Sequence, residues 1–288
     1  MPKIENGWGE KWPAPAKLNL MLRIVGQRPD GYHLLQTVFQ FIDLCDWISF
    51  HPADDGRVFL QNTLAGVAEN DDLTIRAAKR LKAETACDLG VRIEVEKNLP
   101  MGGGLGGGSS DAATTLVVLN KLWNLNLSTE KLMQLGLSLG ADVPVFVYGH
   151  AAWAEGVGEI LSPIDLPEQY YAVLTPSVHV STAQVFANSA LTKDTKPLKI
   201  ADFSRDEYSS LFRNDLENVV CKEFPAVAST LKWLNQYGQA RMSGSGASVF
   251  VAVNSQSKAN EILAQKPENT TGFVAKSLMQ HPLYALAV

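Results

Sequence analysis

A glycine-rich run constrains this chain more than any other feature of its sequence. Residues 100–114 read PMGGGLGGGSSDAAT, with six glycines among the seven residues 102–108. Glycine adopts positive φ without a Cβ clash, and consecutive N–H groups can turn inward to bind an anion where a helix begins. The run lies between an alternating strand pattern at 91–100 and an apolar helix pattern at 110–123. It therefore predicts a phosphate-binding loop rather than a flexible linker.

Two common nucleotide-binding motifs fit this run poorly. A P-loop needs Lys and then Ser or Thr directly after its last glycine, whereas here Ser109 and Ser110 follow the glycines. The glycine spacing within 102–107 formally matches a dinucleotide fingerprint, which also needs a following strand and an acidic residue beyond it. Residues 124–140 instead predict a second helix, begun by Ser128, so the βαβ context is missing.

Length and composition indicate a globular protein of two domains. The chain has 288 residues, of which 46% are hydrophobic, enough to build a sizeable core. The segment around 155–167 is rich in glycine and proline, which predicts a boundary there, between domains at 1–160 and 161–288. Strand and helix patterns alternate in both parts, so a mixed α and β fold is expected.

Charge and cysteine content narrow the class of partner. The net charge of −5 and the lack of a dense basic run predict that the chain does not bind nucleic acid. Cys45, Cys87 and Cys221 are widely spaced and odd in number, which favours reduced thiols over disulfides or a metal site. Residues 1–15 contain no apolar signal-peptide region, and no run of 18 apolar residues occurs. We expect a cytoplasmic protein that acts on a small molecule and has no membrane partner.

The N-terminal segment predicts two strands joined by a hairpin. Residues 14–24 alternate, with Lys17 and Asn19 on the more polar face. The tract QRPDGYH at 27–33 carries an Asp-Gly turn signal, and a second strand, or pair of strands, follows over 37–50. The hairpin would present its last two residues, Tyr32 and His33.

The middle of the chain predicts two helices and, after them, a pair of strands. Residues 73–85 form an amphipathic helix pattern, and 110–123 is apolar nearly all round, as expected of a buried helix. Polar residues at 109–111 are suitable N-caps for that second helix. Residues 143–154 predict a strand, a turn at Gly149 and another strand.

Beyond residue 161 the clearest features are a helix pattern and a second loop of small residues. The helix is expected over about 225–237, and Gly244 and Gly246 precede a strand. That loop could close over the phosphate cleft, although alone it would indicate only a tight turn. Asp142 follows a helix-ending glycine, where an aspartate is most often a backbone cap. By themselves, Lys17 and His33 also fit ordinary surface positions.

Four segments together resemble the GHMP kinases, the superfamily of galactokinase, homoserine kinase, mevalonate kinase and phosphomevalonate kinase. They are PAPAKLNL at 13–20, PMGGGLGGGSSDAAT at 100–114, LGADVPVF at 139–146 and MSGSGASVF at 242–250. Together with QRPDGYHLLQTVFQ at 27–40, they most resemble the branch that phosphorylates 4-diphosphocytidyl-2-C-methyl-D-erythritol. The likeness runs from about residue 12 to the C-terminus.

The resemblance implies both a fold and a reaction. The fold is α+β in two domains, the first like domain 2 of ribosomal protein S5 and the second a ferredoxin-like sandwich. The reaction moves the γ-phosphoryl group of ATP to the 2-hydroxyl of the cytidine-diphosphate acceptor, in the non-mevalonate route to isoprenoid precursors. Such a transfer needs mainly positioning, charge stabilisation and one group to accept the hydroxyl proton.

The resemblance also assigns residues to roles. Asp142 matches the general base, and Lys17 matches the cation that orients it. The positions matched to ATP are Lys97, near adenine, and the loop residues Pro100, Met101, Gly102, Gly103, Gly104, Leu105, Gly106, Gly107, Gly108, Ser109 and Ser110. Mg²⁺ is expected to be carried mainly by ATP, with help from Ser110, since the chain offers no cluster of carboxylates for it.

On the acceptor side, four residues are matched to the substrate. Asn19 shares a strand face with Lys17 and would bind near Asp142, whereas Tyr32, His33 and Phe186 match positions that bind cytosine. His33 would hydrogen-bond the base edge and Phe186 would stack on the ring, an interaction worth about 1–3 kcal/mol per base. A weak homodimer is left open.

One position departs from the family pattern, and two alternatives stay open. Asp72 stands where related sequences usually have Asn, which puts a polar contact to adenine in doubt. A GHMP kinase acting on homoserine or a mevalonate derivative would need no base-stacking pair. A nucleotide-binding regulator without catalysis would need neither Lys17 nor Asp142.

Overall fold

The computed structural model describes residues 7–64, 66–200 and 212–287. Its strands are β1 (Lys11–Gln27), β2 (His33–Ala53), β3 (Val58–Leu60), β4 (Gly90–Glu96), β5 (Ala152–Glu155), β6 (Ile160–Pro163), β7 (Tyr170–Pro176), β8 (Arg241–Met242), β9 (Val249–Val253) and β10 (Thr270–Leu278). Its α-helices are α1 (Leu73–Thr85), α2 (Gly107–Leu122), α3 (Thr129–Leu137), α4 (Val143–Tyr148), α5 (Thr182–Ala187), α7 (Glu217–Glu223), α8 (Pro225–Leu234), α9 (Gln256–Ala264) and α10 (Tyr284–Ala287). Short 3₁₀ turns cover Glu69–Asp71 and Asn235–Tyr237.

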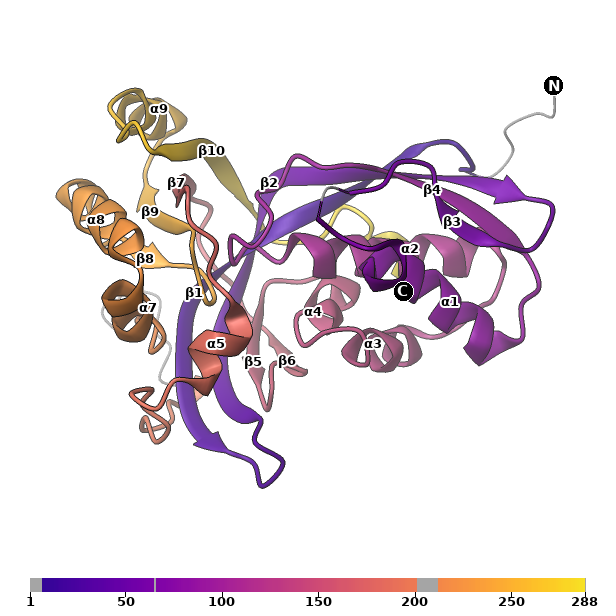
Figure 1. The fold of residues 1–288 in the computed structure, drawn as a ribbon, viewed down its shortest axis with the longest axis horizontal. Coiled ribbons are helices and arrows are strands. Elements are labelled where there is room, and N and C mark those ends of the chain that lie inside the picture. The colour runs from indigo at the N-terminus through magenta and orange to yellow at the C-terminus, as the bar shows by residue number, and fades with distance from the viewer. Residues whose placement is uncertain (1–6, 65, 201–211, 288) are drawn as a thin grey trace.

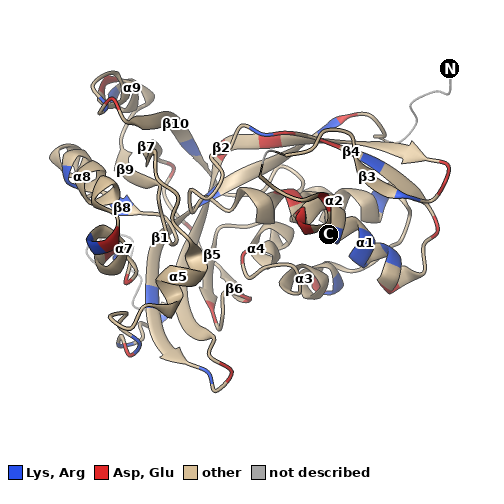
Figure 2. Ribbon diagram, in the orientation of Figure 1, with Lys and Arg blue, Asp and Glu red and all other residues tan. Residues whose placement is uncertain are grey.

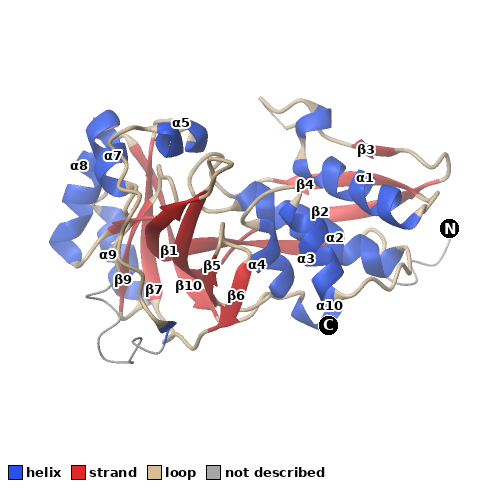
Figure 3. Ribbon diagram, turned by 90° about the horizontal axis from the view of Figure 1, so that it is seen from below, coloured by secondary structure: helices blue, strands red, loops and turns tan. Residues whose placement is uncertain are grey.

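One mixed sheet connects the two halves of the molecule. Within the described residues its main path runs β3-β4-β2-β10-β7-β9-β8, while β1 pairs with β2 and the β5–β6 hairpin also joins β2. Helices α1 to α4 pack beneath the long strands at one end, and α7, α8 and α9 cover the strands at the other end (Figure 1). The same division is visible from below, with β1, β7 and β10 between the helix groups (Figure 3).

The predicted N-terminal hairpin is confirmed, and it forms the central part of this arrangement. β1 and β2 pair antiparallel from Lys11↔Ser49 to Gln27↔His33, with irregularities that include one between Asn19 and Met21. β1 supplies side chains to three hydrophobic clusters in turn, from Ala14 near α2 to Ile24 near α8. Lys17 and Asn19, on the more polar face of β1, are buried as well, so both faces of this strand are covered.

Helix α2 begins earlier than the polar residues at 109–111 indicated. Its N-cap is Gly106, at φ 75°, and no side chain caps it. Ser110 and Asp111 are instead buried in its first turn. Glycine's tolerance of the left-handed region lets the loop turn directly into the helix, so the expected side-chain cap is absent.

The strand expected over the first part of 143–154 was also wrong, because residues 143–148 form α4. Alternating valines favour a strand by propensity, but Pro144 lies in the first turn of the helix and Gly149 ends it at φ 76°. The apolar residues of α4 are buried against α2 and α3. Tertiary packing therefore overrides local propensity here, while the second expected strand is confirmed as β5.

The other predicted elements are confirmed with small changes of boundary. Residues 73–85 form α1, and Ser128 caps α3 by accepting a hydrogen bond from Lys131 N. The predicted division at residues 160 and 161 stays a prediction, and β6 crosses it. The cysteines are free, with Cys45 buried and the other two half-buried.

Helix length and the distribution of charge complete the description of the fold. None of the helices in the described ranges has the length and apolar character needed to cross a bilayer. Figure 2 shows Lys and Arg interspersed with Asp and Glu along both halves.

Candidate active site

A cavity of about 1070 Å³ brings most of the predicted site residues together. Its lining includes the hairpin that ends β1, the glycine loop, the start of α4, one side of α5, and Gly244 and Ser245. The predicted residues in its wall are Lys17, Asn19, Tyr32, His33, Lys97, Pro100 to Ser109, Asp142 and Phe186. Ser110 is not in the wall, because it is fully buried beneath the loop. Segments far apart in the sequence therefore form one site.

A lysine–aspartate ion pair lies beside the glycine loop. Lys17 Nζ lies 3.1 Å from Asp142 Oδ2, and the two side chains are 3% and 34% exposed. Lys17 also donates hydrogen bonds to Asn19 Oδ1, at 2.5 Å, and to the Gly104 carbonyl, at 3.1 Å. The buried ammonium is thus held from three sides, while the carboxylate it orients stays open to the cavity.

Asn19 is itself held in one orientation. Its Nδ2 donates to Thr37 Oγ1 at 2.9 Å, and Thr37 Oγ1 donates to the Met21 carbonyl at 2.5 Å. This chain fixes the amide so that its oxygen faces Lys17. Nothing in the sequence pattern singled out Thr37, which becomes important only because β2 lies beside β1.

The glycine loop has the backbone that its composition predicted. Gly102, Gly104 and Gly106 all have positive φ, between 67° and 75°. A Cβ at Gly106 would lie 3.0 Å from Lys17 Cε and from Phe146, so the loop comes as close to the ion pair as backbone can. The loop leads into α2, whose N-terminal N–H groups and dipole favour an anion.

The second small-residue loop, Ser243–Ser248, packs directly on the first. Ser243 Oγ donates to the Gly104 carbonyl at 2.9 Å, and Ser248 N donates to the Gly103 carbonyl at 3.1 Å. A Cβ at Gly104 would lie only 2.2 Å from the Ser243 carbonyl oxygen. The second loop therefore holds the glycine loop in place, and its Gly244 and Ser245 also line the cavity.

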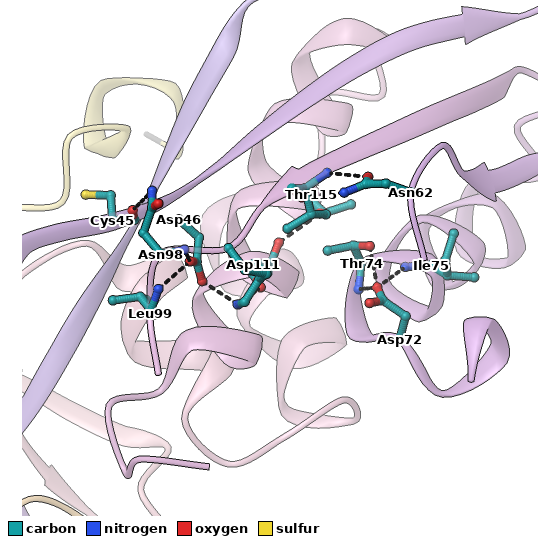
Figure 4. Close-up of polar contacts among 12 residues, drawn as sticks. Cys45, Asp46, Asn62, Asp72, Thr74, Ile75, Asn98, Leu99, Asp111 and Thr115 are labelled. Carbon is teal, nitrogen blue, oxygen red and sulfur yellow. Dashed lines mark hydrogen bonds and ion pairs between the residues drawn. The ribbon is translucent and has the colours of Figure 1, made fainter. Parts of the chain in front are cut away.

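Lys97 is neutralised by two buried carboxylates that the sequence analysis missed. Its Nζ pairs with Asp111 Oδ2 at 2.7 Å and, more closely still, with Asp46 Oδ2. Asp46 also accepts hydrogen bonds from the backbone N–H groups of Asn98 and Leu99, as the dashed lines in Figure 4 show. These contacts anchor the start of the loop to β2.

The same cluster shifts the pKa values of two of its members, Lys97 and Asp111. Burial lowers the pKa of Lys97, but the carboxylates of Asp111 and Asp46 raise it by more, so the ammonium stays charged. Burial raises the pKa of Asp111 to about 7, with Lys97 opposing the shift and Asp46 adding to it. Lys97 lines the cavity, and its expected contact with adenine stays a prediction.

Asp72 has a structural role with which its departure from the family pattern is compatible. It is the N-cap of α1, and its Oδ1 accepts from Thr74 N at 2.8 Å and Ile75 N at 3.3 Å (Figure 4). Only 4% of the residue is exposed. Asp and Asn are equally good caps, so the helix start is preserved.

Three aromatic rings, those of Tyr32, His33 and Phe186, line the other end of the cavity. We call this end the aromatic slot. His33 and Phe186 have ring centroids 5.4 Å apart, and Tyr32 is 64% exposed at the rim. His33 Nε2 is buried without a hydrogen-bond partner. Burial lowers the pKa of His33, and the charge of Lys193 lowers it further, which favours the neutral imidazole. A neutral ring with an unused nitrogen can recognise the edge of a base.

The described residues offer no ready-made cluster of side chains for a metal ion. No group of three or more His, Cys, Asp or Glu side chains is arranged to hold an ion among them. The hydroxyl of Ser110 is fully buried at the end of the glycine loop and has no hydrogen-bond partner. An unused hydroxyl oxygen is a donor of the type that Mg²⁺ prefers.

Comparison with known proteins identifies the family. The model of the GHMP kinases N terminal domain matches residues 72–150, and that of the GHMP kinases C terminal matches residues 194–269. The 4-diphosphocytidyl-2-C-methyl-D-erythritol kinase of Nitrosococcus oceani is 55% identical over 265 residues, covering 92% of this chain and 93% of that protein. These matches confirm the α+β fold with GHMP kinase N- and C-terminal domains.

Solved structures agree with the sequence relatives. A 4-(cytidine 5′-diphospho)-2C-methyl-D-erythritol kinase superposes with a TM-score of 0.80 at 31% identity, covering 93% of this chain and 98% of that one. A homoserine kinase from Cytophaga hutchinsonii reaches 0.71 at 17% identity, covering 98% and 97%, a likeness of fold alone. The chain therefore belongs to the 4-diphosphocytidyl-2-C-methyl-D-erythritol kinase family of the GHMP kinases.

Proposed function

We propose that this chain transfers the γ-phosphoryl group of ATP to the 2-hydroxyl of 4-diphosphocytidyl-2-C-methyl-D-erythritol, with Asp142 as the base. The products are the 2-phosphate and ADP, in the non-mevalonate route to isoprenoid precursors. The observation that carries this assignment is the ion pair of Lys17 and Asp142, 3.1 Å apart, beside the glycine loop. A half-exposed carboxylate beside a buried ammonium is suited to accept a proton from a bound hydroxyl.

The chain's own groups divide the work of the reaction. The N–H groups of the glycine loop and of the first turn of α2 bind the phosphates of ATP. Asp142 accepts the hydroxyl proton, while Lys17 orients that carboxylate and balances the negative charge that develops at the attacking oxygen. When bound, Mg²⁺ would be carried mainly by ATP and would neutralise phosphate charge, and the buried, unpartnered Ser110 hydroxyl is the oxygen of the loop that would help to hold it.

The aromatic slot supports a cytidine-bearing acceptor over the other GHMP substrates. Tyr32 and Phe186 can stack on opposite faces of a pyrimidine, and His33 Nε2 has a free hydrogen-bonding position for the base edge. Homoserine or a mevalonate derivative would leave this slot unfilled. A regulator without catalysis would have no use for a carboxylate held by Lys17 at the end of the glycine loop.

The first experiment measures ADP release from ATP and Mg²⁺ with three acceptors. We expect turnover with 4-diphosphocytidyl-2-C-methyl-D-erythritol and none with homoserine or mevalonate. Asp142→Asn should reduce kcat by about 10²-fold or more, the usual contribution of an acid–base group, while ATP still binds.

The matched control is Asp165→Asn, which makes the same change at an exposed position outside the cavity. It should leave kcat unaltered. Near-normal turnover by the Asp142→Asn protein would contradict the role of Asp142. ATP binding by the unaltered protein without turnover of any acceptor would instead favour a regulator.

A further inference from the structure

Three lysines line the cavity in the described part of the chain, and they differ in how their charge is balanced. Lys17 faces Asp142, and Lys97 faces Asp46 and Asp111. Lys193 has no carboxylate partner among the described residues. Its contact there is a hydrogen bond of 3.3 Å to Oε1 of Gln27, a neutral amide. Among the described residues of the cavity wall, Lys193 is therefore the lysine whose charge is available for a negatively charged ligand.

The position of Lys193 is at the aromatic end of the cavity. Its partner Gln27 ends β1, and Gln27 Nε2 donates to the Gly31 carbonyl at 3.0 Å within the hairpin that carries Tyr32. The charge of Lys193 also contributes to the lowered pKa of His33, so the ammonium lies within electrostatic range of that ring. The acid of the same hairpin, Asp30, is already paired with Arg28 at 2.7 Å.

The acceptor's chemistry requires a counter-charge close to this place. A diphosphate carries at least two negative charges at neutral pH, and only one ribose separates it from the pyrimidine. If the base lies in the aromatic slot, the diphosphate must start near that slot and continue toward Asp142. Charge-assisted hydrogen bonds from a lysine to phosphate oxygens are stronger than those between neutral groups.

We propose that Lys193 binds the diphosphate of the acceptor and so makes the site select a nucleoside diphosphate over an uncharged nucleoside. This inference rests on the proposed function, because it takes the aromatic slot as the cytidine site. Lys193 extends from the loop that follows α5 and is exposed, so its side chain can leave Gln27 and reach the ligand. It is a binding residue and has no part in proton transfer.

The test compares binding of cytidine 5′-diphosphate and cytidine by calorimetry, without ATP and without turnover. Lys193→Gln should weaken cytidine 5′-diphosphate binding by about fivefold or more, as expected for one partly exposed charged hydrogen bond. It should leave cytidine binding within twofold of the unaltered protein. Lys193→Arg should retain most of the diphosphate affinity. Lys196→Gln, the same change at an exposed lysine outside the cavity wall, is the matched control.

A second variant separates direct binding from positioning of the hairpin. Gln27→Leu removes the amide that holds Lys193, but it keeps the ammonium. If Lys193 acts only by bracing the hairpin, Gln27→Leu and Lys193→Gln will weaken both ligands alike, and the proposal is overturned. Unchanged cytidine 5′-diphosphate binding by Lys193→Gln would overturn it as well.

Steady-state kinetics then keep the two proposals apart. With 4-diphosphocytidyl-2-C-methyl-D-erythritol, Lys193→Gln should raise KM for the acceptor and leave both kcat and KM for ATP unchanged. If the unaltered protein does not phosphorylate this acceptor, the proposed function fails whatever the variant does. If it does, and the variant shows the same KM, only the assignment of Lys193 fails.

Discussion

Asp72 shows how one residue can satisfy a structural need at the edge of a binding site. Its carboxylate accepts hydrogen bonds from two N–H groups at the start of α1, and the residue also lines the cavity. In the sequence this position stands out only as a departure from the family's adenine contact. The cap was not foreseen there, although an aspartate directly before an amphipathic helix is a recognised start signal.

Replacing Asp72 tests this role. Asp72→Ala should lower the free energy of unfolding by about 1 kcal/mol, because the first N–H groups of α1 lose their acceptor. Asp72→Asn should be within a few tenths of a kcal/mol of the unaltered protein, since the amide oxygen can replace the carboxylate. Urea denaturation of the three proteins measures both values. Equal losses from Ala and Asn would show that charge, rather than capping, is what matters there.

At the scale of elements, the conformations of loops and short helices depend most on contacts with neighbouring elements. The glycine loop could be recognised locally, because its composition permits few backbone conformations. α4 could not be recognised locally, because Val143, Val145 and Val147 favour a strand. These residues form a helix because it is buried against α2 and α3. The contact of the second loop with Gly104 joins residues 139 positions apart.

Gly104→Ala should disturb the site through this contact between the two loops. The added methyl group would lie 2.2 Å from the Ser243 carbonyl, so one of the loops must move, and kcat/KM for ATP should fall by more than about tenfold. Gly9→Ala is the control for backbone strain alone. Gly9 has a similar φ of 78°, outside the cavity, and its nearest neighbour is 3.7 Å from the added carbon.

Measuring initial rates over a range of ATP concentrations distinguishes the two glycine variants. Gly9→Ala should cost about 1 kcal/mol of stability, the penalty of a left-handed alanine, and leave kcat/KM unchanged. If Gly104→Ala retains normal kcat/KM for ATP, the close packing of the loops is not needed for nucleotide binding.

At the scale of the whole molecule, the end of the chain returns to the first helices. α10 packs on α2 and α4, and His281 N donates to the Gly149 carbonyl at 2.8 Å. His281 is buried, and its Nδ1 accepts from Leu283 N at 3.0 Å. Burial lowers the pKa of His281 to about 3. The imidazole therefore stays neutral in the folded protein under conditions in which the unfolded chain binds a proton.

This difference predicts a pH dependence of stability. Between about pH 6.5 and pH 3 the unfolded state binds the extra proton, so the free energy of unfolding falls as the pH decreases, by about 1.4 kcal/mol per unit. His281→Asn keeps an acceptor for Leu283 N but cannot titrate, so it should remove this part of the slope. Denaturation at pH 7.0 and 5.0 measures the slope. Identical slopes for both proteins would refute the assignment to His281.

Much of the site could be predicted because its chemistry is concentrated in short segments. The glycine loop, Lys17 and Asp142 were each recognisable from a motif of a few residues, as was the hairpin with Tyr32 and His33. Their roles came from the family resemblance, and the structure adds that they line one cavity. No local pattern pointed to Asp46, because its partners Lys97 and Leu99 lie more than fifty residues away.

The sequence alone determined the family, the α+β class, the phosphate-binding loop and the types of residue available for catalysis. Glycine content and hydrophobic periodicity, which act over a few residues at a time, indicated the loop and a mixture of strands and helices. The family and the α+β class came from the resemblance of the short motifs to the GHMP kinases. Only the tertiary structure decided that α4 is a helix, that Lys97 is held by two carboxylates and that Lys193 is left with a neutral partner. Burial and charge balance depend on which distant segments meet, and that meeting is a property of the folded chain.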